Sequence, residues 1–169
     1  MKIVSIFADQ LFSFRYPGEA DNEYDRLMEL WTDISYLKDF AQKNNIADVE
    51  AFAKEILHGA EQIQDFLENI NQNQERYDFY FESLQLSEDN KPLAFQKGKI
   101  KWNKLRYYAI KLDANCFVIT GGAIKMSQTM QEHPATNYEL AKLKAAKAFL
   151  NENGVIDEDS FYELLTEQQ

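Results

Sequence analysis

Basic and aromatic side chains follow one another closely in the segment 97–108, and these residue types are the best candidates for chemistry. Lysines stand at alternate positions from Lys97 to Lys101, so on an extended chain their ammonium groups point the same way. Cations hold phosphates, and aromatic rings stack on bases. The segment predicts an RNA-binding surface made of Lys97, Lys99, Lys101, Lys104, Trp102 and Tyr107. An edge strand whose lysines prevent aggregation, with the rings in the core, explains the pattern equally well.

Charge is distributed unevenly along the chain. The 169 residues carry a net charge of −10, which argues against general nucleic-acid binding. Residues 1–90 contain 7 basic and 19 acidic residues, whereas residues 91–150 contain 11 basic and 3 acidic ones. Residues 151–169 contain six acidic residues and no basic one. Such segregation indicates a charged partner for one part of the chain, and it directs the search for function to 91–150.

Signatures of the common enzyme classes are absent from the sequence. It has no C-x-x-C pair, no H-E-x-x-H, no phosphate-binding glycine loop and no G-x-S-x-G. One cysteine, Cys116, and two distant histidines, His58 and His133, cannot supply the four ligands of a structural zinc site. We therefore expect no metal and no cofactor. The single cysteine, the early polar residues and the lack of a long apolar run predict a cytoplasmic protein without a membrane segment.

Hydrophobic periodicity predicts the elements of the first half of the chain. Two β-branched and aromatic runs, 3–7 and 11–16, predict an N-terminal hairpin. Apolar residues at helical spacing then predict three helices, the second of them capped by Asp33. Their apolar stripes cover 24–31, 34–41 and 49–70. The polar face of the third helix is acidic, which an ordinary solvated surface explains, and 74–90 has no clean period.

A second hairpin is predicted after the basic segment. Its strands are 105–112 and 116–120, joined by a turn at 113–115. Gly121-Gly122 then predicts a bulge or a close backbone approach, with 123–126 as the continuation of the strand.

Two more helices complete the predicted fold. The T-x-x-E spacing of 136–139 predicts a capping box that opens a helix ending near Gly154. Asp157 is predicted to cap a short last helix. Since strands and helices come in blocks, the fold class is α+β: a single domain, 1–169, with one mostly antiparallel sheet built from the two hairpins and covered by helices.

The order of residue types in 91–150 resembles the C-terminal half of the RelE/ParE/HigB toxin superfamily. The resemblance rests on an arginine-bearing strand at 105–111, and on an apolar strand at 115–125 with a small residue ahead of Lys125. A proline at 134 and a lysine-rich helix from Thr136 complete it. The pattern covers about a third of the chain. It implies a RelE-like core in which the region of about 20–75 is an acidic helical insertion.

The resemblance also implies a function. It is that of a bacterial toxin of a toxin–antitoxin pair, a metal-independent endoribonuclease acting on mRNA at the ribosome. The implied partners are a cognate antitoxin protein and RNA or the ribosome; a homo-oligomer stays open. Because the RNA's own 2′-hydroxyl attacks, the protein positions the phosphate and assists proton transfer. The implied catalytic residues are Arg106 and Lys125 at the phosphate, with Tyr108 in proton transfer or stacking.

Two alternatives stay open. A non-catalytic module on the same fold would bind RNA or protein through 91–125, and Met126 in place of the family's second lysine fits this hypothesis. The acidic helices of 20–70 would instead mimic nucleic-acid charge and occupy a basic partner. The ribonuclease requires Arg106 and Lys125 to converge on one phosphate-sized spot, on the same surface of the sheet.

Overall fold

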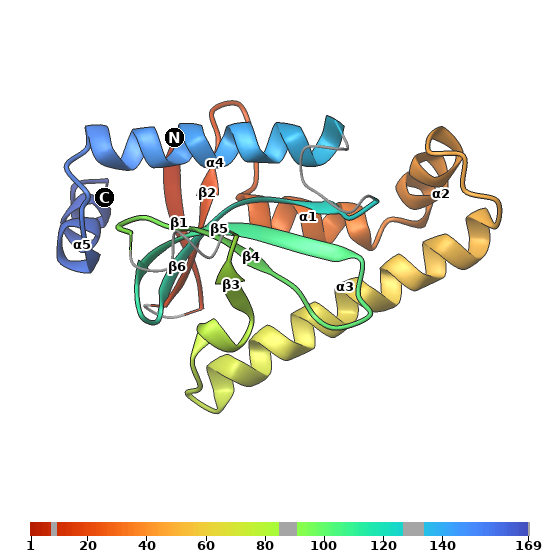
Figure 1. The fold of residues 1–169 in the computed structure, drawn as a ribbon, viewed down its shortest axis with the longest axis horizontal. Coiled ribbons are helices and arrows are strands. Elements are labelled where there is room, and N and C mark those ends of the chain that lie inside the picture. Colours follow the sequence, from red (N-terminus) through yellow and green to blue (C-terminus); the bar gives the residue numbers. More distant parts are fainter. Residues whose placement is uncertain (8–9, 85–90, 127–133, 169) are drawn as a thin grey trace.

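The chain folds around one six-stranded sheet, shown in the computed structural model of Figure 1. The structure describes residues 1–168 except 8–9, 85–90 and 127–133. The strand order is β1-β2-β6-β5-β4-β3, and all neighbours are antiparallel except β2 and β6. The strands are β1 Lys2–Phe7, β2 Leu11–Arg15, β3 Phe81–Ser83, β4 Phe95–Gly98, β5 Leu105–Asp113 and β6 Cys116–Ile124. The predicted α+β fold class and both hairpins are confirmed.

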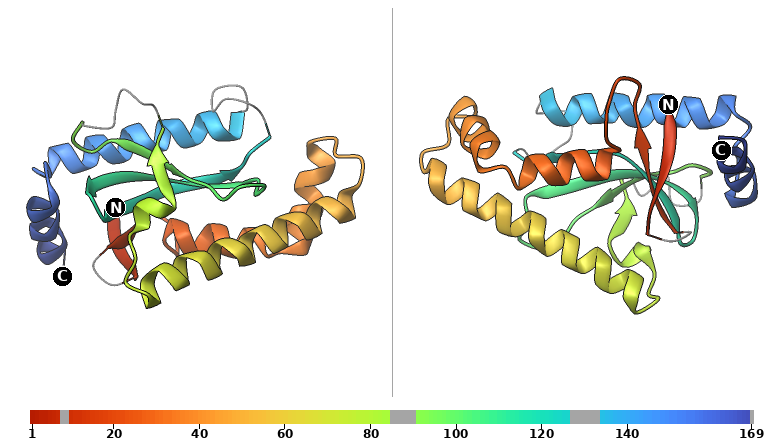
Figure 2. Two further views of the ribbon diagram at one scale, coloured as in Figure 1. Left: turned by 60° about the horizontal axis from the view of Figure 1, so that its bottom comes forward. Right: turned by 180° about the vertical axis from the view of Figure 1, so that it is seen from behind.

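Helices cover both faces of this sheet. They are α1 Glu23–Trp31, α2 Ile34–Lys43, α3 Val49–Gln72, α4 Pro134–Glu152 and α5 Glu158–Glu167. Figure 2 shows α1 and α3 on one side of the sheet and α4 on the other, with α5 beside one end. None of the described helices combines the length and the apolar character that a bilayer-spanning segment requires.

Alternation along β5 divides the core into two layers. Leu105, Tyr107 and Ala109 pack with α1 and α3, whereas Tyr108 and Ile110 pack with α4 and α5. Successive side chains of a strand point to opposite faces, so a strand buried on both faces is apolar nearly throughout. The same alternation fixes the direction of every polar residue in β5, which is why it decides where a site can form.

Short polar side chains fix where four helices begin. Asn22, Asp33 and Asp48 each accept a hydrogen bond from the backbone N–H three residues later, at the starts of α1, α2 and α3. Asp157 and Ser160 form a reciprocal capping box at α5. The caps predicted at Asp33 and Asp157 are confirmed.

The capping box predicted at 136–139 is wrong. Helix α4 begins at Pro134, two residues earlier, where the fixed φ of proline suits the first turn of a helix. Glu139 accepts instead a hydrogen bond of 2.8 Å from the backbone N–H of Gly122 on β6. The carboxylate of Glu139 therefore makes a tertiary contact with β6 and not the helix cap that the local spacing predicted.

Two short strands, β3 and β4, extend the sheet beyond the predicted hairpins. β4 pairs with β5 from Phe95↔Ile110 to Gly98↔Tyr107, and β3 pairs with β4 from Phe81↔Gly98 to Ser83↔Gln96. At Gly98 the ring of Tyr80 lies directly over the backbone, in the space that a Cβ would fill. The absence of a side chain at this position allows the 3-10 turn Tyr77–Phe79, which precedes β3, to pack against the sheet.

Gly98→Ala is expected to destabilise the fold by about 3 kcal/mol, since the new methyl group overlaps the Tyr80 ring and forces backbone or ring to move. Urea denaturation measures this loss. Adding Tyr80→Ala to Gly98→Ala should cost less than the two single losses together. Strict additivity would show that the ring is not the obstacle.

Candidate nucleic-acid interface

A pocket opens where β4 parts from β5. The two strands pair as far as Gly98↔Tyr107, and the loop 99–104 then leaves the sheet before the chain enters β5. The resulting pocket, here called the strand-end pocket, has a volume of about 450 Å³. The residues in its wall that can act on a nucleic acid are Asp78, Phe79, Glu82, Lys99, Lys101, Trp102 and Arg106. Four of the predicted site residues, Lys99, Lys101, Trp102 and Arg106, therefore share one cavity.

Arg106 supplies the most deeply placed charge in the strand-end pocket. It lies opposite Ala123 on the α4 face of the sheet and is half-buried. Its Nη1 donates hydrogen bonds to the carbonyls of Asn103 and Leu105. Its Nε and Nη2 make no hydrogen bond to any other described residue. Burial lowers the pKa of the guanidinium, but arginine keeps its charge in proteins, so Arg106 offers a fixed cation for a phosphate.

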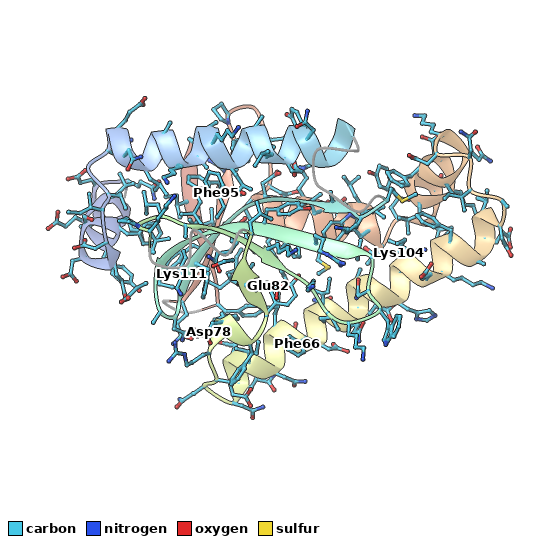
Figure 3. The ribbon with its side chains drawn as sticks, viewed as in Figure 1. Phe66, Asp78, Glu82, Phe95, Lys104 and Lys111 are labelled. Carbon is cyan, nitrogen blue, oxygen red and sulfur yellow. The ribbon has the colours of Figure 1, made fainter. Side chains whose placement is uncertain are left out.

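Glu82 stands among the cations of this region, on the face that Arg106 occupies. It lies opposite Lys97 in the β3–β4 ladder. Its Oε1 is 3.2 Å from Nζ of Lys99 and 3.9 Å from Nζ of Lys97. Figure 3 shows Glu82 on β3, which is the edge strand of the sheet. Glu82 was not predicted as a site residue, because the sequence of 74–90 has no regular period. Only the pairing of β3 with β4 brings Glu82 opposite Lys97.

Two exposed rings stand at the strand-end pocket. Trp102 is 90% exposed and Phe79 is 66% exposed. Nζ of Lys101 lies 5.5 Å from the centroid of the Trp102 ring. Large rings are rarely left in water, and an indole beside an ammonium presents both a stacking surface and a charge to a nucleotide. The stacking role predicted for Trp102 has the exposure that it requires.

Three other predicted residues lie away from the strand-end pocket. Tyr107 is fully buried on the α1 face, and its hydroxyl donates 2.8 Å to the carbonyl of Tyr24, so it presents no ring to a base. Tyr108 is buried on the α4 face, where burial raises the pKa of its phenol to about 12. Lys104 contacts Glu55 on α3 at 3.0 Å, and Figure 3 shows it beside that helix.

Lys125 lies just beyond the end of β6. Its N–H donates 2.7 Å to the carbonyl of Lys104, so the ladder with β5 extends one residue past Ile124. Arg106 pairs with Ala123, two residues before Lys125. Alternate positions of a strand share a face, so the register assigns Arg106 and Lys125 to one surface of the sheet. Lys125 is not among the residues that line the strand-end pocket.

A second cluster of charged residues, which was not predicted from the sequence, is buried between α1 and α4. Arg26 donates to Glu23 at 2.6 and 2.9 Å, and Lys142 contacts both Glu23 and Glu139, the latter at 3.2 Å. The hydroxyl of Tyr16 donates to the carbonyl of Thr120 nearby. The spacing i, i+3 of each pair was visible in the sequence, but only the fold brings the two helices together.

The pKa values within this cluster follow from burial and pairing. Burial raises the pKa of Glu23, but hydrogen bonds from Arg26 and Lys142 outweigh it and hold that pKa below its usual value. Burial raises the pKa of Glu139, and its contacts with Lys142 and the Gly122 N–H offset this only in part. The charges of the two carboxylates and the two cations cancel along the edge of β6. This indicates a structural role, in which the cluster holds α1 and α4 together.

No family model, curated protein or solved structure matches the chain. No group of three or more His, Cys, Asp or Glu side chains that could hold a metal ion occurs within the described ranges. The strand-end pocket is therefore the arrangement from which a function can be argued, since it combines cations, a carboxylate and exposed rings.

Proposed function

We propose that the chain is a RelE-like, metal-independent endoribonuclease that cuts single-stranded mRNA in the strand-end pocket. One observation supports this proposal: a carboxylate (Glu82), three cations (Lys99, Lys101 and Arg106) and two exposed rings line the same cavity. Each part of RNA cleavage by the neighbouring 2′-hydroxyl needs one of these groups. The resemblance of 91–150 to the toxin superfamily points in the same direction.

The reaction proceeds in one displacement at phosphorus. The carboxylate of Glu82 takes the proton of the 2′-hydroxyl, and the 2′-oxygen forms a bond to the adjacent phosphorus. The bond from phosphorus to the 5′-oxygen breaks, and that oxygen takes a proton from the ammonium group of Lys99 or Lys101. The products are a 2′,3′-cyclic phosphate and a free 5′-hydroxyl. Arg106 stabilises the negative charge that develops on the non-bridging oxygens.

The charge of the whole molecule limits the substrate to a short single strand. A duplex carries one negative charge per about 1.7 Å of its axis, so a protein of net charge −10 repels it. Near the strand-end pocket three cations face two carboxylates, Asp78 and Glu82, and the local balance is positive. Trp102 and Phe79 stack only on bases that are not paired.

A cleavage assay tests the proposal. A fluorescent oligoribonucleotide is incubated with the purified protein and EDTA, with and without ribosomes, beside the same sequence as DNA. We expect the RNA to be cut to a 2′,3′-cyclic end and the DNA to be bound but not cut. Absence of both binding and cleavage, with and without ribosomes, would overturn the proposal.

A second candidate function is non-catalytic RNA binding at the same cavity. The burial of Tyr108 favours it, because this phenol was the predicted proton-transfer group and burial raises its pKa to about 12. Salt-sensitive binding of RNA without any cleavage product, both with and without ribosomes, would favour this function over the nuclease.

Arg106→Ala is expected to weaken RNA binding about tenfold, because a charge-assisted hydrogen bond to phosphate contributes about 1.5–3 kcal/mol and part of it is recovered by Lys99. The slope of log K against log salt should also fall by about 0.7, the value for one phosphate contact on a single strand. Fluorescence anisotropy at several salt concentrations measures both. The matched control is Lys38→Ala, a cation paired with Glu50 at 3.4 Å between α2 and α3 and outside the strand-end pocket, whose loss should leave the slope unchanged. An unchanged slope for Arg106→Ala would remove this residue from the interface.

A further inference from the structure

The loop 99–104 places a fully exposed ring next to a buried amide. Trp102 is 90% exposed, whereas Asn103, the next residue, is 6% exposed. The N–H of Asn103 donates 3.0 Å to the carbonyl of Ile100, which closes the loop into a tight turn. A loop that turns its largest apolar side chain to solvent and buries an asparagine inverts the usual arrangement. Contacts with other parts of the fold must therefore stabilise this conformation of the loop.

The side chain of Asn103 ties this loop to α3 and to β5. Its Nδ2 donates to the carbonyl of Gly59 at 2.9 Å and to Oε1 of Gln62 at 3.0 Å. Its Oδ1 accepts from the N–H of Leu105 at 2.9 Å. Three hydrogen bonds on one buried amide fix both its position and its orientation.

The backbone of Asn103 reaches the pocket from the other side. Its carbonyl accepts a hydrogen bond from Nη1 of Arg106, so the arginine is oriented by the residue that α3 anchors. On its other side Trp102 has a φ of 65°, a left-handed conformation that a bulky side chain adopts only when its surroundings enforce it. The anchored Asn103 is the neighbour that can enforce it.

Gly59 makes this anchor possible. It lies in the interior of α3, where glycine is unfavourable for the helix. A Cβ at Gly59 would lie 3.1 Å from Oδ1 and 3.2 Å from Nδ2 of Asn103, closer than ordinary contact. Glycine thus lowers the helix propensity of α3 at this position, but it leaves room for the side-chain amide of Asn103 to approach the helix backbone.

We infer that Asn103 is a positioning residue of the strand-end pocket: it presents Trp102 to a base and orients Arg106 toward a phosphate. For the identity of the ligand this inference rests on the proposed function. Its geometric part, that Asn103 holds the loop and the guanidinium in place, does not.

The first test uses Gly59→Ala. Helix propensity alone predicts equal or higher stability for this variant. If the new methyl group displaces Asn103, the affinity for RNA should fall about three- to tenfold while the stability stays unchanged. A purely structural role of Asn103 would not produce this combination. The matched control is Asn22→Ala, which removes another buried asparagine, the cap of α1, and should lower stability but not affinity. Unchanged affinity of Gly59→Ala for an RNA that the wild type binds would overturn the inference.

The second test needs no RNA. In Asn103→Ala, ¹⁵N relaxation of the Trp102 indole should show increased mobility, whereas the buried Trp31 indole, the internal reference, should not change. An indole of Trp102 that is as ordered as in the wild type would overturn the inference, whether or not RNA binds. Failure of the wild type to bind any RNA would overturn the proposed function and leave this readout to decide on Asn103.

A double-mutant cycle links the two parts. Asn103→Ala is expected to lower RNA affinity about tenfold as a single substitution and clearly less when Arg106→Ala is already present. The effects of two substitutions are not additive when one residue acts through the other. Equal fold-changes in both backgrounds would show that Asn103 does not act through Arg106.

Discussion

Replacing Glu82 with glutamine is expected to lower the rate of RNA cleavage by about 10²- to 10⁴-fold, the usual contribution of a general base. The glutamine keeps the shape and the hydrogen-bond acceptor that faces Lys99, but it cannot take a proton from a 2′-hydroxyl. RNA affinity should stay equal or rise, because a negative charge beside the phosphate has been removed. Single-turnover cleavage and anisotropy on the same RNA measure the two effects.

The matched control is Glu55→Gln. Glu55 also faces a lysine, Lys104, at 3.0 Å, but on α3 and outside the strand-end pocket. Its variant should cleave RNA at the wild-type rate. A Glu82→Gln protein that cleaves as fast as the control would show that this carboxylate is not the base, whatever its affinity.

Lys142→Ala is expected to lower the free energy of unfolding by about 3–5 kcal/mol, because it leaves the carboxylates of Glu23 and Glu139 buried with less compensation. Such a loss is a large part of the roughly 5–15 kcal/mol that hold a domain together. Urea denaturation at neutral pH measures it. Lys43→Ala, which breaks the exposed pair with Asp39, should leave the free energy of unfolding nearly unchanged, because water screens that pair.

The pH dependence of the free energy of unfolding of Lys142→Ala shows whether buried charge causes the loss of stability. Without Lys142 the pKa values of Glu23 and Glu139 both rise above those in the wild-type fold, so the folded variant binds protons more tightly than the folded wild type. A carboxyl with a raised pKa contributes stability at low pH and loses it as the pH rises. The deficit of Lys142→Ala should therefore shrink on acidification from pH 7 toward about pH 4, near the usual pKa of Glu. A deficit that is constant with pH would point to lost packing and not to the buried charges.

The local pattern of the chain was sufficient to predict the hairpins and helices. The 24-residue helix α3 repeats its apolar stripe over many turns, and β5 and β6 have nine residues each. The strands β3 and β4 have three and four residues, too few to show a period. They form because β5 offers an edge to β4 and the Gly98 backbone gives room to Tyr80, and both facts belong to the tertiary structure.

The candidate site was predicted in part for the same reason. Lys99, Lys101, Trp102 and Arg106 are close in sequence, so they stay close in the fold. Glu82 reaches them only through the β3–β4 ladder. Lys104 follows the lysine pattern of the loop but meets Glu55 on α3, which the spacing of lysines could not indicate.

The parallel pairing of β2 with β6 has a consequence for how the protein is made. Leu11 and Ser13 lie opposite Phe117 and Ile119 in the parallel ladder, more than a hundred positions later in the chain. During synthesis the β2 edge of the first hairpin therefore stays uncovered until most of the polypeptide has been made, because its neighbour β6 comes late in the chain. Closure of so distant a pairing favours slow folding, so chaperone demand should be greatest for a nascent chain that stops short of β6.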